Sequence, residues 1–160
     1  MALGAAAGCA VGQGSPDGWR YLRSGPVAVA HPKTWQRTPT GAALRLPGGR
    51  TDAQLTVGTV STVATAAGTG HGAPPPPPHA ARRETLRIDG RSARVLSYLS
   101  PAPDGRPATW VDVTLQTRDG RPVEVRAWTL NGRTVRTASG HGTADGRLLL
   151  REIVDSIELD

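Results

Sequence analysis

A turn motif that recurs at regular spacing is the feature that most restricts how this 160-residue chain can fold. The triplet Asp-Gly-Arg begins at Asp89, Asp104 and Asp119, at intervals of 15 residues, and occurs again at Asp145. A variant, Asn-Gly-Arg, begins at Asn131. Asp-Gly and Asn-Gly readily adopt the positive φ angles of tight hairpin turns, so they predict antiparallel neighbours where they separate alternating apolar segments.

The segments between these turns alternate between apolar and polar residues, as half-buried strands do. In the two clearest segments the apolar positions are Val111, Val113 and Leu115, then Val123, Val125 and Ala127. The positions that point the opposite way include Asp112, Thr114, Glu124 and Arg126. Together with residues 85–88 and 93–99, these segments predict a four-stranded antiparallel meander over about residues 83–130.

The N-terminal half predicts further strands at residues 19–23, 26–30, 42–46 and 54–60, separated by Gly/Pro turns. The pattern stops between residues 61 and 81. Five consecutive prolines at 74–78 cannot enter a central strand or helix, so we expect a Gly/Pro-rich loop at 68–81 that serves as a spacer. A proline run can also bind an SH3-like or WW-like module.

The last segment, residues 144–157, predicts an amphipathic helix. Its apolar stripe consists of Leu149, Leu150, Ile153, Val154 and Ile157, and Arg147, Arg151, Glu152 and Asp155 fall largely outside it. Asp145 or Thr143 can cap its start. A helix with one apolar stripe must lie across the face of a sheet.

We therefore expect an α+β fold: a twisted antiparallel sheet of about six to eight strands, with the meander in the C-terminal half and the helix packed on it. The length is typical of one domain, which we place at residues 19–160, after a residual signal and flexible tether at 1–18. Aromatic residues make up 4% of the chain and phenylalanine is absent. Aliphatic side chains and a few tryptophans, with Trp35 as a plug, must therefore fill the core.

The only cysteine, Cys9, follows a run of small residues. A single cysteine excludes an intramolecular disulfide and a Cys-x-x-Cys metal or redox pair. The segment Ala6-Ala7-Gly8-Cys9 resembles the lipobox of bacterial lipoproteins, with Ala6 where leucine is usual. We expect lipidation at Cys9, which would attach an extracytoplasmic protein to the cell membrane. The alternatives are an incidental cysteine and a secreted protein.

The chain carries 19 basic and 13 acidic residues, for a formal net charge of +6. This charge would suit an anionic membrane, an anionic polymer or an envelope protein as partner. The arginines are scattered, and Arg82-Arg83 is the one adjacent pair. Because nucleic-acid binding needs a basic stripe or a recognisable module, we expect no nucleic-acid partner, and we expect a monomer.

No motif predicts a catalytic residue, a metal site or a cofactor. The sequence lacks a Gly-x-Ser-x-Gly elbow and a phosphate loop, and most carboxylates fall in turns or on the helix surface. The four histidines, His31, His71, His79 and His141, lack ligand spacing. We interpret His71 and His141, which stand in Gly-His-Gly triplets, as exposed loop residues.

Trp110 and Trp128 are the candidate ligand-facing residues. Each shares a strand face with polar neighbours, Asp112 for the first and Arg126 for the second. An aromatic ring in such a place can stack on a ligand, but more often it packs beneath a helix or loop.

Three segments, in order along the chain, resemble the Mog/PsbP-like family. Residues 26–35, Pro-Val-Ala-Val-Ala-His-Pro-Lys-Thr-Trp, resemble its opening strand and Pro-x-x-Trp. Residues 88–93, Ile-Asp-Gly-Arg-Ser-Ala, resemble its Gly-x-x-Ala hairpin, and residues 153–157, Ile-Val-Asp-Ser-Ile, resemble the end of its last helix. Residues 61–81, where the family usually has a helix, are too rich in Gly and Pro to predict one.

The resemblance implies a twisted antiparallel sheet sandwiched by helices, in proteins that act by binding and share no catalytic residues. We therefore expect a non-catalytic lipoprotein that serves as a binding or accessory module at the cell envelope. The alternative is a small-ligand carrier or an unrecognised enzyme with the same fold. A deep pocket with converging polar groups near Trp110, Trp128 or the histidines would favour that alternative.

Overall fold

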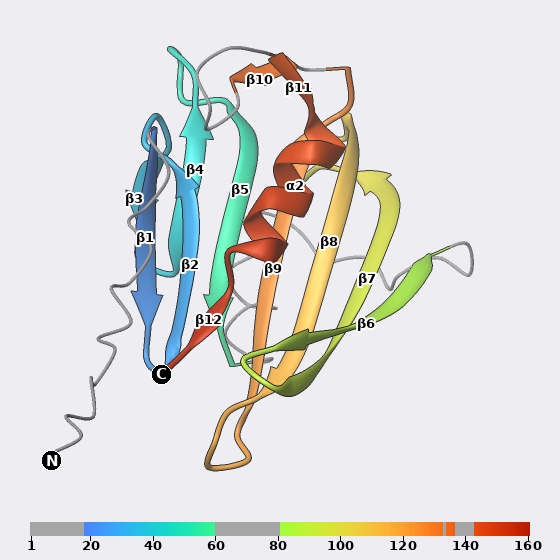
Figure 1. Ribbon diagram of the computed structural model, residues 1–160. Helices are drawn as coiled ribbons and strands as arrows, with labels where there is room; N and C mark the ends of the chain where they lie inside the picture. The colour runs from blue at the N-terminus through green and yellow to red at the C-terminus, as the bar shows by residue number, and fades with distance from the viewer. Residues whose placement is uncertain (1–17, 60–80, 133, 137–142) are drawn as a thin grey trace, which may run out of the picture.

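The computed structural model describes residues 18–59, 81–132, 134–136 and 143–160, which form twelve β-strands in three sheets and one helix (Figure 1). Cys9, the expected loop at 68–81 apart from Ala81, and His71, His79 and His141 lie outside these residues. Within them no helix is long and apolar enough to cross a membrane. The chain is mostly antiparallel sheet with a short C-terminal helix, as the predicted α+β class requires.

The largest sheet has seven strands in the order β3-β4-β5-β9-β8-β7-β6, and all its pairs are antiparallel. Its strands are β3 (Gln36–Thr38), β4 (Gly41–Arg45), β5 (Thr51–Gly58), β6 (Arg82–Ile88), β7 (Arg91–Pro101), β8 (Pro107–Gln116) and β9 (Pro122–Leu130). The four-stranded meander predicted at 83–130 is confirmed, because β6 to β9 pair consecutively.

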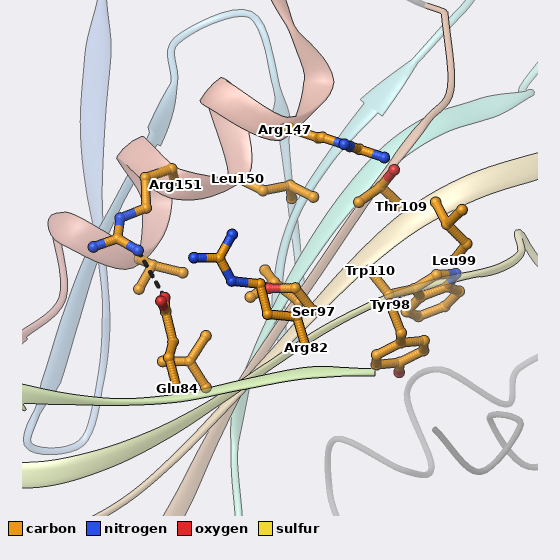
Figure 2. Close-up of a pocket in the computed structure, with 13 residues that line it drawn as sticks. Arg82, Glu84, Ser97, Tyr98, Leu99, Thr109, Trp110, Arg147, Leu150 and Arg151 are labelled. Atoms are coloured by element: carbon orange, nitrogen blue, oxygen red, sulfur yellow. Dashed lines mark hydrogen bonds and ion pairs between the residues drawn. The ribbon is translucent and has the colours of Figure 1, made fainter. Parts of the chain in front are cut away.

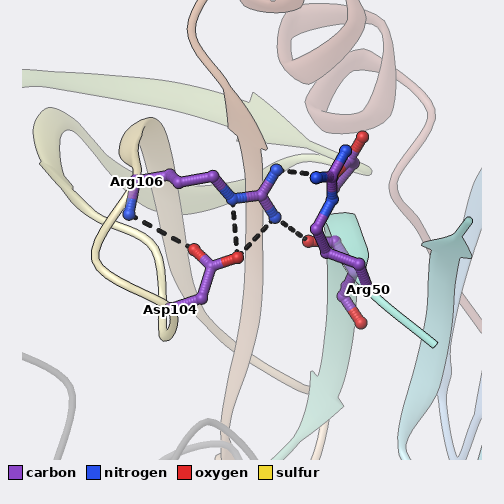
Figure 3. Close-up of polar contacts among 5 residues, drawn as sticks. Arg50, Asp104 and Arg106 are labelled. Atoms are coloured by element: carbon purple, nitrogen blue, oxygen red, sulfur yellow. Dashed lines mark hydrogen bonds and ion pairs between the residues drawn. The ribbon is translucent and has the colours of Figure 1, made fainter. Parts of the chain in front are cut away.

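The turns of this meander take the conformations that their sequences predicted. Asp89 and Gly90 both have positive φ, 47° and 77°, as a two-residue hairpin turn requires. Gly105 and Gly120, at φ 83° and 79°, close the two longer turns. The turn between β7 and β8 is also held by charge: Arg106 Nη1 donates to Asp52 Oδ1 of β5 at 2.8 Å (Figure 3). This ion pair ties the end of the meander to the neighbouring strand.

A second sheet has the order β1-β2-β12, and β10 and β11 form a separate antiparallel pair. These strands are β1 (Trp19–Ser24), β2 (Val27–Pro32), β10 (Thr134–Arg136), β11 (Thr143–Asp145) and β12 (Glu158–Leu159). The strands predicted in the N-terminal half correspond to β1, β2, β4 and β5. The sequence did not predict β3, β10, β11 or β12, because two or three residues are too short to show a period.

The single helix of the described residues, α2 (Gly146–Asp155), lies across β8 and β9 on one face of the large sheet (Figure 1). Its predicted stripe is buried, with Ile153 fully shielded from solvent. The predicted start at Ala144 is wrong, because residues 143–145 pair with β10. Gly146 begins the helix where backbone and sheet approach closely: a Cβ there would lie 2.5 Å from the Thr129 methyl group.

The main core fills the space between α2, the β1-β2 hairpin and this face of the large sheet. Aliphatic side chains dominate it, and Trp35, expected as a plug, is 3% exposed. Its largest fully buried members include Val27, Val29, Leu55, Val95, Val113, Leu115, Val125, Leu149 and Ile153.

The opposite face of the large sheet holds a second buried cluster, which contains Tyr98, Ala102, Ala108, Trp110, Trp128 and Leu130. Asp112 and Glu124 lie on the same face and are only 5% and 6% exposed. The alternation of the sequence placed these two carboxylates on strands, opposite the apolar positions, and the structure adds that they are buried. Strand alternation fixes only which side of the sheet a residue faces, and both sides of this sheet are buried at its centre.

Candidate functional site

A cleft of about 430 Å³ opens between α2 and the outer strands of the meander (Figure 2). Its charged lining residues are Arg82 and Glu84 from β6 and Arg147 and Arg151 from α2. The other described residues that line it are Val95, Ser97, Tyr98, Leu99, Thr109, Trp110, Val111, Leu150 and Val154. The volume falls within the range of about 300–1,000 Å³ that is usual for small-molecule sites.

Strand register places the residues that β6 and β7 contribute opposite α2 on one face of the large sheet. Arg82 is paired with Ser97, and Glu84 with Val95, so these four residues share the face that α2 covers. Leu99, two residues beyond Ser97, faces the same way.

The helix contributes residues four apart. Arg147 and Arg151 are separated by about one turn, and so are Leu150 and Val154, which places each pair on a common side of α2. The arginines reach the mouth of the cleft, whereas Leu150 and Val154 are buried against the sheet.

Among the described residues that line the cleft, three guanidinium groups face one carboxylate, so this lining carries an excess of positive charge. Arg151 Nη1 lies 2.7 Å from Glu84 Oε1, and its Nε lies 3.0 Å from Asp155 Oδ1. The Arg82 guanidinium forms no ion pair with any residue in the described part of the chain, and it points from β6 towards α2 (Figure 2). Arginine stays protonated and offers a planar fork of donors that matches carboxylate and phosphate oxygens.

One end of the cleft is apolar, and the strands there are held by an aromatic stack on the opposite face of the sheet. The Trp110 indole donates from Nε1 to the Ser100 carbonyl at 3.0 Å, and its ring centroid lies 6.3 Å from that of Tyr98 and 5.7 Å from that of Trp128. Leu99 follows Tyr98 in β7, so it points to the α2 side of the sheet, and it is 56% exposed. An exposed leucine on a well-held strand offers apolar contact without any rearrangement.

A separate ionic cluster lies on the face of the sheet opposite α2. Arg126 Nε donates to Asp112 Oδ1 at 2.8 Å, and its Nη2 donates to Glu124 Oε1 at 2.9 Å. The Tyr98 hydroxyl donates to Asp112 Oδ2 at 2.9 Å. Burial raises the pKa of Glu124, and the nearby Asp112 charge adds to this effect while Arg126 opposes it. Burial is also the main cause that raises the pKa of Tyr98.

Trp110 and Trp128, the candidate ligand-facing residues, are both nearly inaccessible, at 3% and 4% exposed. Trp110 is among the residues that line the cleft, whereas Trp128 stacks on it and is not among them. Cys9 lies outside the described residues.

His31 is the one histidine in the described part of the chain, and it is buried beside Trp35. Its Nδ1 lies 2.9 Å from the Pro32 carbonyl oxygen, and burial lowers its pKa. Among the described residues, no group of three His, Cys, Asp or Glu side chains is placed to hold a metal ion.

The cleft arginines and Leu99 were missed by sequence reasoning. Arg82 belongs to the one adjacent basic pair, and Arg147 and Arg151 show helical spacing, but nothing local indicates that β6 and α2 meet. That proximity depends on the order of the sheet, in which β6 is an edge strand beside the helix.

Neither a known protein family nor a curated protein matches this sequence. The argument about function therefore depends on the geometry and charge of the cleft.

Proposed function

We propose that this chain is a non-catalytic binding module of the bacterial cell envelope, and that the cleft beneath α2 holds an anionic ligand. The observation that carries the proposal is the convergence of Arg82, Arg147 and Arg151 on a cleft whose described lining contains one carboxylate, that of Glu84. Charge-assisted bonds from guanidinium groups to oxyanions are among the stronger polar contacts in proteins.

The charged groups of the cleft suit recognition better than chemistry. Guanidinium groups remain protonated, so they bind anions but do not exchange protons at neutral pH. The Glu84 carboxylate already accepts a bond from Arg151. A cleft equipped in this way can hold and orient an oxyanion.

The envelope location is the second part of the proposal. It rests on the lipobox-like segment that ends at Cys9 and on the resemblance to the PsbP-like family, whose members include small exported lipoproteins. A helix across an antiparallel sheet is compatible with that family. The alternative, a small-ligand carrier, is favoured by the volume of the cleft, which suits a small molecule.

Anion binding can be tested by titrating the isotope-labelled protein with inorganic phosphate and following backbone amide shifts. Saturable shifts are expected in β6 and in the first turns of α2. Arg82→Gln should weaken binding about tenfold, because it removes a charge-assisted contact worth about 1.5–3 kcal/mol.

The matched control is Arg83→Gln, since Arg83 is the next residue of β6, is also exposed and points to the other face of the sheet. It should bind phosphate nearly as well as the parent protein. Equal losses in the two variants, or no saturable shifts at all, would overturn the assignment of the cleft.

The tether can be tested in the native host by labelling with a fatty acid and separating membranes from soluble material. The protein is expected to incorporate the label and to sediment with membranes, and Cys9→Ala should lose both properties. Stable anchoring by acyl chains requires two lipid signals, so loss of the lipidated residue should release the protein. Unchanged membrane retention of Cys9→Ala would contradict the tether.

A further inference from the structure

We infer that the ligand of the cleft is an amphiphile, with an oxyanion headgroup held by Arg82 and a hydrocarbon chain on the apolar side of the cleft. This inference rests on the proposed function, since it assumes that the cleft binds anions. It adds that the headgroup alone is not the complete ligand.

The first observation is the exposure of Leu99. Among the described residues, Leu99 and Leu148 are the two large hydrophobic side chains that are exposed, at 56% and 58%. Leu99 lines the cleft, whereas Leu148 does not. Covering an exposed leucine with hydrocarbon is favourable in proportion to the apolar area removed from water.

The second observation is that charge and apolar surface are separated along the cleft. Figure 2 shows Arg82 rising from β6 towards α2, and Arg147 reaching from α2 towards Thr109. Leu150 lies between these two arginines, and Leu99 lies beyond them. At the other end of the cleft, Arg151 and Glu84 form an ion pair.

This arrangement gives the ligand one orientation. A phosphate or carboxylate headgroup beside Arg82 can accept charge-assisted bonds from that guanidinium group. A chain attached to it can then extend over Leu150 towards Leu99, since the charged Arg151 and Glu84 side chains occupy the opposite end and offer no apolar surface. The volume, about 430 Å³, suits one headgroup with a single short chain.

The experiment compares three probes by calorimetry: dodecyl phosphate below its micelle concentration, inorganic phosphate and dodecyltrimethylammonium. Dodecyl phosphate is expected to bind at least tenfold more tightly than inorganic phosphate, because its chain covers apolar surface that the ion leaves exposed. Dodecyltrimethylammonium, which has the same chain and the opposite charge, should bind at least tenfold more weakly than dodecyl phosphate.

Two exposed leucines provide matched variants. Leu99→Ser should weaken the binding of dodecyl phosphate about fivefold and leave the binding of inorganic phosphate unchanged. Leu148→Ser alters an equally exposed leucine outside the cleft, so it should affect neither probe. Neither change disturbs the core, and both proteins should fold.

The outcomes separate the two proposals. Equal affinity for dodecyl phosphate and inorganic phosphate would overturn the amphiphile and leave the anion site in place. Equal losses in Leu99→Ser and Leu148→Ser, or tight binding of dodecyltrimethylammonium, would also overturn the amphiphile, since the chain would then adsorb without using the cleft. If neither phosphate compound binds, the proposed function fails as well.

Discussion

Arg126 lies between two carboxylates on the face of the sheet opposite α2, where water has little access. The side chains of Arg126, Asp112 and Glu124 are 12%, 6% and 8% exposed. With both acids ionised, the group carries two negative charges against one positive charge. Burying an excess charge is costly, and the cost falls when one acid is protonated.

This imbalance predicts how stability should depend on pH at Glu124. Because the folded-state pKa of Glu124 is raised by burial, the folded protein holds this proton more tightly than the unfolded chain does. The stabilisation from Glu124 is therefore present below its ordinary pKa of 4.5, and it is lost as the pH rises through the folded-state pKa. Glu124→Gln, which is always neutral, should gain stability relative to the parent protein over the same rise.

Urea melts of both proteins at several pH values between 4 and 8 would measure this difference. The free energy of unfolding of Glu124→Gln minus that of the parent should increase with pH. A difference that falls with pH would show that the attraction of Arg126 outweighs burial, and the direction assigned to the pKa of Glu124 would be wrong.

At the scale of elements, α2 stabilises the fold by covering the large sheet. Ile153 is fully buried on the covered side, whereas Leu148 is 58% exposed on the same helix. Ile153→Ala removes packed atoms and leaves a cavity, so it should lower the free energy of unfolding by about 2–5 kcal/mol. Leu148→Ala should change it by no more than about 0.5 kcal/mol.

Denaturant melts of these two variants provide a direct comparison, since both changes place alanine in the same helix. If Leu148→Ala were the more damaging change, the covered side of α2 would be misplaced. The cleft beside it would then be misplaced as well, because Leu150 and Val154 line it from the same helix.

The elements that could be predicted from the sequence are those whose signals are local. Asp-Gly turns and alternating valines indicated β7 to β9 and their order, and the spacing of Leu149 and Ile153 indicated which side of α2 is buried. Register and burial follow from such patterns because each depends on residues a few positions apart.

At the scale of the whole molecule, the features that escaped prediction join segments that are distant in the sequence. β12 pairs with β2 across more than a hundred residues, and Arg151 meets Glu84 across 67 residues. The candidate cleft is of this kind, since β6 and α2 supply its charges. Of its residues only Trp110 was named beforehand as a candidate ligand-facing residue, and its aromatic character was the local signal.

The C-terminal residues 158–160 make polar contacts with segments that are distant in the sequence. The backbone N–H of Leu159 donates to Asp89 Oδ2 in the β6-β7 turn, and the Tyr21 hydroxyl of β1 donates to Glu158 Oε1. Asp160 accepts an ion pair from Arg23. Through these contacts residues 158–160 connect strand β1 to the β6-β7 turn.

The position of α2 and β12 after the large sheet in the sequence affects biosynthesis. Translation proceeds from the N-terminus, so the large sheet emerges from the ribosome before α2 and β12 exist. The apolar face that Leu149, Ile153 and Val154 cover remains open until these two elements have been synthesised. The nascent polypeptide therefore exposes apolar surface during that interval, and chaperones that bind such surface can recognise it.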